Sequence, residues 1–131
     1  ASFGNCFLKK INKINSKYLK LANYYTKNLR EIVKTPIYDL KICKPTFHQY
    51  IIRTQKRDKL KKYLSKFNIE TAIHYPIPIH KQLAYSKNYG FLKLKNTEKF
   101  SKQILSLPIH YYINKKQQNF IIKKIKDFFK K

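Results

Sequence analysis

The chain has 131 residues and a net charge of +24, which comes from 30 lysines and arginines against 6 acidic residues. This length suits one compact domain and is too short for most multi-domain enzymes. No stretch approaches the roughly 20 apolar residues that a membrane span requires. The sequence has no methionine, and its first residues lack the basic start and apolar core of a signal peptide. We therefore expect a fragment, an excised domain or a truncated product, without a membrane segment.

The positive charge is almost entirely lysine. Only Arg30, Arg53 and Arg57 are arginines, so 27 of the basic residues are lysines. A charge of this size is typical of nucleic-acid binding, but base recognition mainly uses arginine. The abundance of lysine, asparagine, isoleucine, tyrosine and phenylalanine also fits an A+T-rich coding bias. We favour that bias and expect no specific nucleic-acid partner.

An amphipathic helix is predicted over residues 3–33. At 1.5 Å per residue it would be roughly 45 Å long, which is more than a small domain can cover. Thr35-Pro36 ends the helix, because proline disfavours helix in the residue before it. We therefore divide the chain into residues 1–34, a helix that needs a packing partner besides the rest of this chain, and residues 35–131, a small α+β domain. The apolar residues recur every three or four positions: Phe7, Ile11, Ile14, Tyr18, Leu21, Tyr25, Leu29 and Ile32.

Short strands and helices are predicted in the remainder. Strands are expected over residues 46–53 and 69–75, on either side of a helix that Thr54 begins and Asn68 ends. One face of that helix is apolar, with Leu60, Tyr63, Leu64 and Phe67.

The last third is expected to begin with a polar loop over residues 84–96. Thr97 then caps a short helix, and residues 107–109 are extended. Asn114 and Gln117 form a capping box at the start of a final helix. The apolar residues of these two helices are Phe100, Ile104 and Leu105 in the first, and Ile121, Ile125 and Phe128 in the second.

The segment from Thr71 to Tyr85, TAIHYPIPIHKQLAY, differs most from the lysine-rich background. Its two prolines exclude helix and extend the residues before them, so His74 and Tyr75 stand on a stiff loop. Positioned donors on a stiff loop are typical of a binding site.

This segment and its surroundings resemble the DegT/StrS-type sugar aminotransferases. FHQYIIR (47–53) is similar to the family's "HxYxIR" strand, and RDKL (57–60) to its "RDEL" helix start. NIETAIHYPIPIH (68–80) is similar to "GIxTxIHYPIPLH", and LSLPIH (105–110) to "LSLPMH". The matches follow the family's order over nearly the whole chain. The resemblance implies the C-terminal α+β domain of a fold-type I aminotransferase, with a mainly antiparallel sheet packed against helices.

The resemblance also implies a function. The full enzyme would use pyridoxal phosphate to transfer an amino group, from a donor such as glutamate, to a nucleotide-linked keto sugar for polysaccharide or glycoconjugate synthesis. It would be a cytoplasmic homodimer. The family's cofactor-binding lysine, ring-nitrogen aspartate and phosphate contacts have no counterpart here, and the only glycines are Gly4 and Gly90. We expect no catalytic residue in this chain, no cofactor bound by it alone and no activity of its own.

The resemblance places His74, Tyr75 and His80 at the substrate cleft, where imidazole and phenol groups can hydrogen-bond a sugar or a diphosphate. The alternatives are core packing for Tyr75 and a surface position for His80. His48 is on the first strand, where an alternating pattern could place it beside the cleft, but we favour a core position. The His74/His80 spacing crosses two prolines and matches no usual metal-ligand pattern, so no metal site is predicted.

Three points remain from the residues alone. The cysteines, Cys6 and Cys43, lie far apart and are expected to be reduced. A nucleic-acid-binding module, with lysines on phosphates and tyrosines stacked on bases, stays an alternative function. So does a non-enzymatic helical interaction domain built on residues 3–33.

Overall fold

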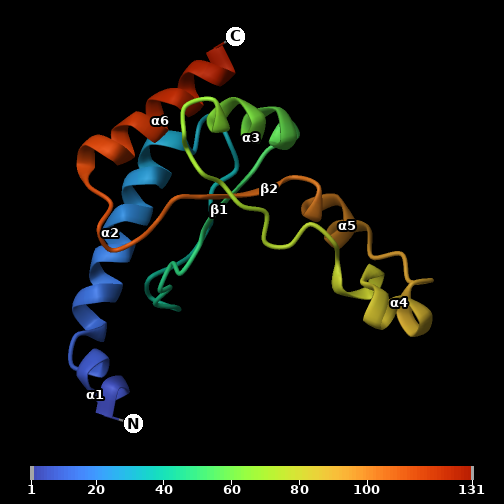
Figure 1. Ribbon diagram of the computed structural model, residues 1–131, viewed down its shortest axis with the longest axis horizontal. Coiled ribbons are helices and arrows are strands. Elements are labelled where there is room, and N and C mark those ends of the chain that lie inside the picture. Colours follow the sequence, from blue (N-terminus) through green and yellow to red (C-terminus); the bar gives the residue numbers. More distant parts are fainter. Residues whose placement is uncertain (1, 131) are drawn as a thin grey trace.

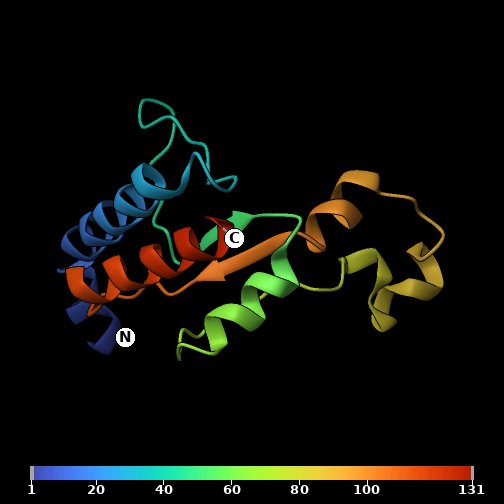
Figure 2. The same ribbon diagram turned by 90° about the horizontal axis from the view of Figure 1, so that it is seen from above.

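The computed structural model describes residues 2–130. Helices α2, α3 and α6 surround a small sheet, while η1, α4 and α5 form a lobe that extends away from them (Figures 1 and 2). Helix α6 packs against both α2 and α3, and α3 also contacts β2. The elements in chain order are α1 (Ser2–Leu8), α2 (Ile11–Leu29), β1 (Tyr50–Arg53), α3 (Arg57–Ser65), η1 (Ile79–Lys81), α4 (Leu83–Tyr89), α5 (Lys95–Ser101), β2 (Ile104–Leu107) and α6 (Lys115–Lys130).

The sheet is antiparallel and pairs β1 with β2. Its register runs from Tyr50 opposite Leu107 to Arg53 opposite Ile104. Two isolated bridges widen it: Lys34 pairs with Arg53, and Ala72 pairs with Ser106. The predicted class, α+β with a small antiparallel sheet packed against helices, is confirmed.

The core lies between this sheet and the three helices. Apolar periodicity on α2 turns Tyr25 and Leu29 inward, where both are fully buried. The buried Gln118 of α6 donates its side-chain amide to the backbone oxygen of Leu21 at 2.7 Å, which fastens α6 to α2. The other buried apolar residues are Ala22, Val33, Phe47, Tyr50, Ile52, Leu60, Leu64, Ile69, Leu105, Leu107, Ile113, Ile121, Ile122 and Ile125.

Two predicted helix ends are confirmed in detail. The backbone N–H of Asn114 donates to Gln117 Oε1 and that of Gln117 donates to Asn114 Oδ1, both at 2.9 Å, which is the reciprocal capping box. After α3, Asn68 adopts a φ of 56°. That left-handed conformation is one that asparagine tolerates well, and it stops the helix.

The N-terminal helix is shorter than predicted. It is divided into α1 and α2 at Lys9–Lys10, and α2 ends at Leu29. Beyond Leu29 the chain turns, and Lys34 exchanges backbone hydrogen bonds of 2.9 and 3.1 Å with Arg53. Pairing with the sheet thus removes residues 30–33 from the helix before Pro36 can act. Nothing in the structure explains the division at Lys9–Lys10.

The strands are also shorter than predicted. Phe47 has a φ of 49°, which no strand can accommodate, so β1 begins at Tyr50. Of the predicted strand over residues 69–75, only the bridge at Ala72 remains.

The prediction for residues 84–105 is wrong in three places. Thr97 does not cap the helix, because it lies within α5, whose N-cap residue is Leu94. The expected polar loop contains helix α4, which ends where the Gly90 N–H donates to the Ser86 oxygen at 2.8 Å. The expected helical residues Ile104 and Leu105 lie in β2, because α5 ends at Ser101 and the following residues pair with β1. Long-range pairing overrides the local helical pattern here.

The lobe joins the core through α3. Arg57 is buried, and its Nη1 donates to the backbone oxygens of Ser101 and Ile104 at 3.3 and 3.5 Å. At the same junction between the lobe and the core, the Arg53 guanidinium lies 4.0 Å from the ring centroid of Phe100. The C-terminal end of α5 is therefore held on the core.

Tyr50 should make the fold sensitive to alkaline pH. Its side chain is fully buried, and its hydroxyl lies 2.7 Å from the Thr26 hydroxyl. Burial raises the pKa of Tyr50 from 10.0 to about 12, against the opposing effect of the Thr26 hydrogen bond. The neutral phenol is thus the form that the fold stabilises. This stability is complete below pH 10 and is lost as the pH rises through about 12.

We expect Tyr50→Phe to remove part of this dependence. The variant should lose roughly 1 kcal/mol of unfolding free energy at pH 7, because Thr26 loses its partner. This difference in unfolding free energy should shrink between pH 10 and pH 12. In that range the Tyr50 phenol ionises in the unfolded wild-type chain, whereas the variant has no phenol at this position. Urea unfolding at several pH values measures the difference. A deficit that stays constant from pH 9 to pH 12 would contradict the assignment.

Candidate substrate cleft

An open cleft of about 620 Å³ lies where the ends of several elements meet. Residues that follow α3, precede β1, follow β2 and begin α6 form its walls. Its apolar wall includes Ile69, Leu107, Ile109 and Ile113. The polar residues that line it are His48, Gln49, Asn68, Glu70, Thr71, His74, Ser106, His110 and Gln117.

The sheet register explains why three histidines share this cleft. Since Tyr50 pairs with Leu107, the residues before β1 lie beside those after β2. His48 and His110 are thereby brought to one edge. The bridge between Ala72 and Ser106 adds the segment that carries His74.

His74 is held by a buried serine. Its Nδ1 lies 2.9 Å from the Ser106 hydroxyl oxygen, and Ser106 is only 6% exposed. The imidazole also meets the Tyr75 ring edge-on, with centroids 5.7 Å apart. Among the described residues, His74 Nε2 has no hydrogen-bond partner. The ring is therefore oriented from one side and offers its second nitrogen to a ligand.

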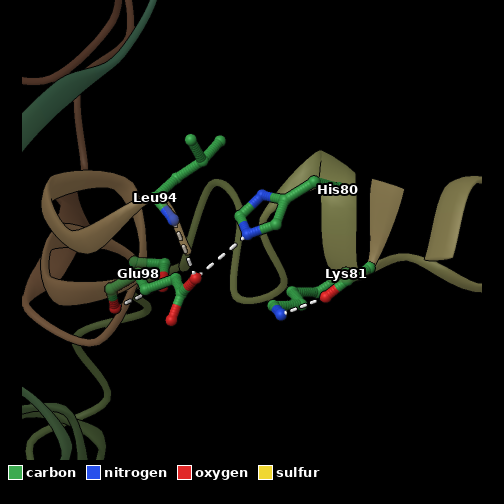
Figure 3. A network of polar contacts seen from close by, with 6 residues as sticks. His80, Lys81, Leu94 and Glu98 are labelled. Atoms are coloured by element: carbon green, nitrogen blue, oxygen red, sulfur yellow. Dashed lines mark hydrogen bonds and ion pairs between the residues drawn. The ribbon is translucent and has the colours of Figure 1, made fainter. Parts of the chain in front are cut away.

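Tyr75 and His80 do not line the cleft. Tyr75 follows His74 and is 69% exposed, so the alternative of a half-buried core tyrosine does not hold. His80 is only 6% exposed, so it is not a surface histidine. Its Nε2 lies 3.1 Å from Glu98 Oε1 (Figure 3). The structure thus keeps one of the three predicted site residues at the cleft.

His48 and His110 also line the cleft, although neither is among the predicted site residues. His48 is exposed at the cleft, so the core position favoured for it is wrong. Both histidines lie within three residues of the ends of the paired strands. The sequence does not reveal this position, because Ile104 and Leu105 fit a helical pattern. The strand that pairs with residues 50–53 is therefore not predicted.

The cleft can supply neutral hydrogen-bonding groups but not the chemistry of a pyridoxal phosphate site. No lysine lines it, and Glu70 is its one carboxylate. Within residues 2–130, there is no group of three or more histidine, cysteine, aspartate or glutamate side chains that could hold a metal ion. Cys43 is exposed and unpaired, while the Cys6 side chain lies outside what the structure describes. Imidazoles, amides and two hydroxyls beside an apolar wall suit a ligand rich in hydroxyl groups.

Comparison with known proteins identifies the family. The model of the DegT/DnrJ/EryC1/StrS aminotransferase family matches residues 1–126. The chain belongs to this family.

None of the helices in residues 2–130 is long and apolar enough to cross a membrane.

Curated relatives in this family include enzymes of sugar amination. The chain is 33% identical over 87 residues to the dTDP-3-amino-3,4,6-trideoxy-alpha-D-glucose transaminase of Streptomyces venezuelae, covering 64% of this chain and 22% of that protein. It is 29% identical over 115 residues to the dTDP-3-amino-3,6-dideoxy-alpha-D-galactopyranose transaminase of Aneurinibacillus thermoaerophilus, covering 85% and 30%. The chain therefore spans less than a third of these relatives.

Solved structures of the family share the fold. A DegT/DnrJ/EryC1/StrS aminotransferase from Brucella abortus superposes with a TM-score of 0.87 at 32% identity, over 95% of this chain and 33% of that one. The S. venezuelae DesV structure, in complex with a ketimine intermediate, gives 0.85 at 25% identity, over 95% and 34%. The family resemblance predicted from the four sequence stretches is thus confirmed.

Proposed function

We propose that this chain is the C-terminal domain of a pyridoxal-phosphate-dependent aminotransferase that acts on nucleotide-linked keto sugars, and that it forms one wall of the substrate cleft. The family match over residues 1–126 carries the proposal. Residues 1–34 would lead to the large domain and residues 35–131 would form the small one. The amino donor would be an amino acid such as glutamate. The enzyme would be a cytoplasmic homodimer that serves polysaccharide or glycoconjugate synthesis.

The cofactor would be held outside this chain. A transaminase needs a desolvated lysine, a carboxylate beside the pyridinium nitrogen and a phosphate cradle. The cleft described here lacks the lysine, and no lysine among the described residues is buried. The residues present therefore do not fit the cofactor, and this domain's contribution is to bind and orient the sugar nucleotide.

Within that role, His74 and Tyr75 would contact the substrate. His74 offers an oriented Nε2, and the neighbouring Tyr75 hydroxyl is exposed. A neutral imidazole and a phenol can each exchange one hydrogen bond with a sugar hydroxyl or a diphosphate oxygen. His80 is the third predicted contact. Because Glu98 already uses its Nε2, only a rearranged His80 could reach the ligand through that nitrogen.

Steady-state kinetics on the full-length enzyme test this role. We expect His74→Asn and Tyr75→Phe each to raise KM for the nucleotide sugar by roughly two- to tenfold, since each removes one hydrogen bond worth about 0.5–1.5 kcal/mol. Asparagine can keep a polar atom near the position of Nδ1, and thus the contact with Ser106, while removing Nε2. Pro76→Ala should weaken substrate binding by loosening the loop, without removing a polar contact.

A matched control is Tyr112→Phe, since Tyr112 is 84% exposed, as Tyr75 largely is, but lies outside the loop that carries His74 and Tyr75. It should leave KM unchanged. Thermal melts accompany every variant. If His74→Asn and Tyr75→Phe lower the melting temperature sharply while kcat/KM per folded molecule stays at the wild-type value, the two residues serve packing and the assignment is wrong.

A further inference from the structure

The loop that carries the proposed contacts is attached at both ends to one continuous segment. At its start, Ala72 and Ser106 exchange backbone hydrogen bonds of 2.8 and 3.3 Å, and His74 contacts the Ser106 hydroxyl. At its end, His80 contacts Glu98. Ser106 lies in β2 and Glu98 in α5, so residues 74–80, which we name the proline loop, are joined at both ends to the segment 95–107.

The distal attachment centres on one carboxylate oxygen. Glu98 Oε1 accepts from His80 Nε2 and also from the backbone N–H of Leu94, both at 3.1 Å (Figure 3). Leu94 is the N-cap residue of α5, immediately before its first residue, Lys95. A carboxylate in the first turn of a helix is stabilised by the free N–H groups there. The same group thus organises the start of α5 and holds the end of the proline loop.

Helix α5, which carries Glu98, is itself joined to the core. The far end of α5 is joined to the core by Arg57, whose Nη1 donates to the Ser101 oxygen at 3.3 Å. His80 itself is buried and lies among residues of the lobe such as Tyr85 and Leu92. Between the two attachments the loop is open to solvent: Tyr75 and Ile77 are 69% and 53% exposed. Its position therefore depends on its ends more than on packing along its length.

We propose that His80 and Glu98 are a positioning pair, which sets where the proline loop presents His74 and Tyr75 to the nucleotide sugar. The proposal rests on the proposed function of the cleft. It requires a proton on His80 Nε2 and an ionised Glu98. Neither residue needs to touch the substrate, so His80 acts through the loop.

The surrounding charges favour the required state. The hydrogen bond from His80 lowers the pKa of Glu98 below its usual value, with smaller contributions from the Leu94 N–H and the nearby positive charge of Lys81. Lys81 donates to the Gly90 oxygen at the end of α4, so its charge stays beside the pair. The carboxylate is therefore ionised at neutral pH, and the contact weakens only as the pH falls through this lowered pKa.

The variants separate the hydrogen bond from the bulk of the ring. His80→Leu and Glu98→Ala remove the contact, whereas His80→Gln can keep an N–H donor near the position of Nε2. Lys87→Ala, an exposed position on α4 of the same lobe, is the control. Each is made in the full-length enzyme loaded with pyridoxal phosphate. Amide hydrogen exchange of residues 74–82 is measured beside kinetics with the nucleotide sugar.

We expect His80→Leu and Glu98→Ala to speed exchange across the proline loop and to raise KM for the nucleotide sugar about fivefold, the usual scale for one lost hydrogen bond, with kcat within about twofold. His80→Gln and Lys87→Ala should stay near wild type. If His80→Leu does not fold, Glu98→Ala against His80→Gln gives the same comparison.

Two results would contradict the proposed positioning role of His80 and Glu98. One is unchanged exchange in Glu98→Ala. The other is faster exchange with an unchanged KM, which would make the contact structural only. Failure of the proposed function is a different result: a wild-type enzyme that aminates no nucleotide-linked keto sugar, while exchange still reports whether the pair holds the loop.

Discussion

The 131-residue chain, incubated alone with pyridoxal phosphate, is expected to form no specific covalent adduct with any lysine. A cofactor-binding lysine needs a lowered pKa, which burial or a neighbouring cation provides. The chain has 27 lysines, yet none of the described ones is buried and none lines the cleft. Exposed lysines can react with the aldehyde weakly and without preference, so no single residue should be selected.

The measurement is absorbance in the region of roughly 400–430 nm, where lysine-bound pyridoxal phosphate absorbs, followed by borohydride reduction and peptide mapping. Free lysine at matched concentration is the control for unspecific reaction. Stoichiometric labelling of one lysine would contradict the expectation and would place a complete cofactor site within this chain.

The elements that could be predicted from the sequence are those with local causes. The capping box at Asn114 and Gln117 depends on residues three apart, and the apolar faces of α2, α3 and α6 depend on helical periodicity. The Asn68 helix end is likewise local. For each of these the structure shows the expected contacts or burial.

The errors arose where distant residues decide the structure. Ile104 and Leu105 follow a helix and share its apolar pattern, but pairing with β1 makes them a strand. The end of α2 moved for the same reason, because Lys34 pairs with Arg53. Helix α4 was overlooked since its sequence is short, polar and close to Gly90.

The candidate site was only partly predictable. His74 was found because the prolines beside it restrict the backbone locally. Its partner Ser106 and the neighbouring His48 and His110 come from other segments, and only the sheet register brings them together. The burial of His80 against Glu98 could not be predicted without knowing how α5 folds back on the loop.

We propose that the full enzyme, of which this chain is one domain, aminates nucleotide-linked keto sugars. The direct measurement uses this chain as part of a full-length enzyme that includes the family's large domain, purified with pyridoxal phosphate. Glutamate is supplied with dTDP- or UDP-linked keto sugars, and formation of the amino sugar and of 2-oxoglutarate is followed.

We expect equal amounts of the two products, a strict requirement for the nucleotide-linked sugar, and a complete loss of turnover when the large domain is removed. No amino sugar from a cofactor-loaded enzyme with any of these substrates, or turnover by the 131-residue chain alone, would contradict the proposal.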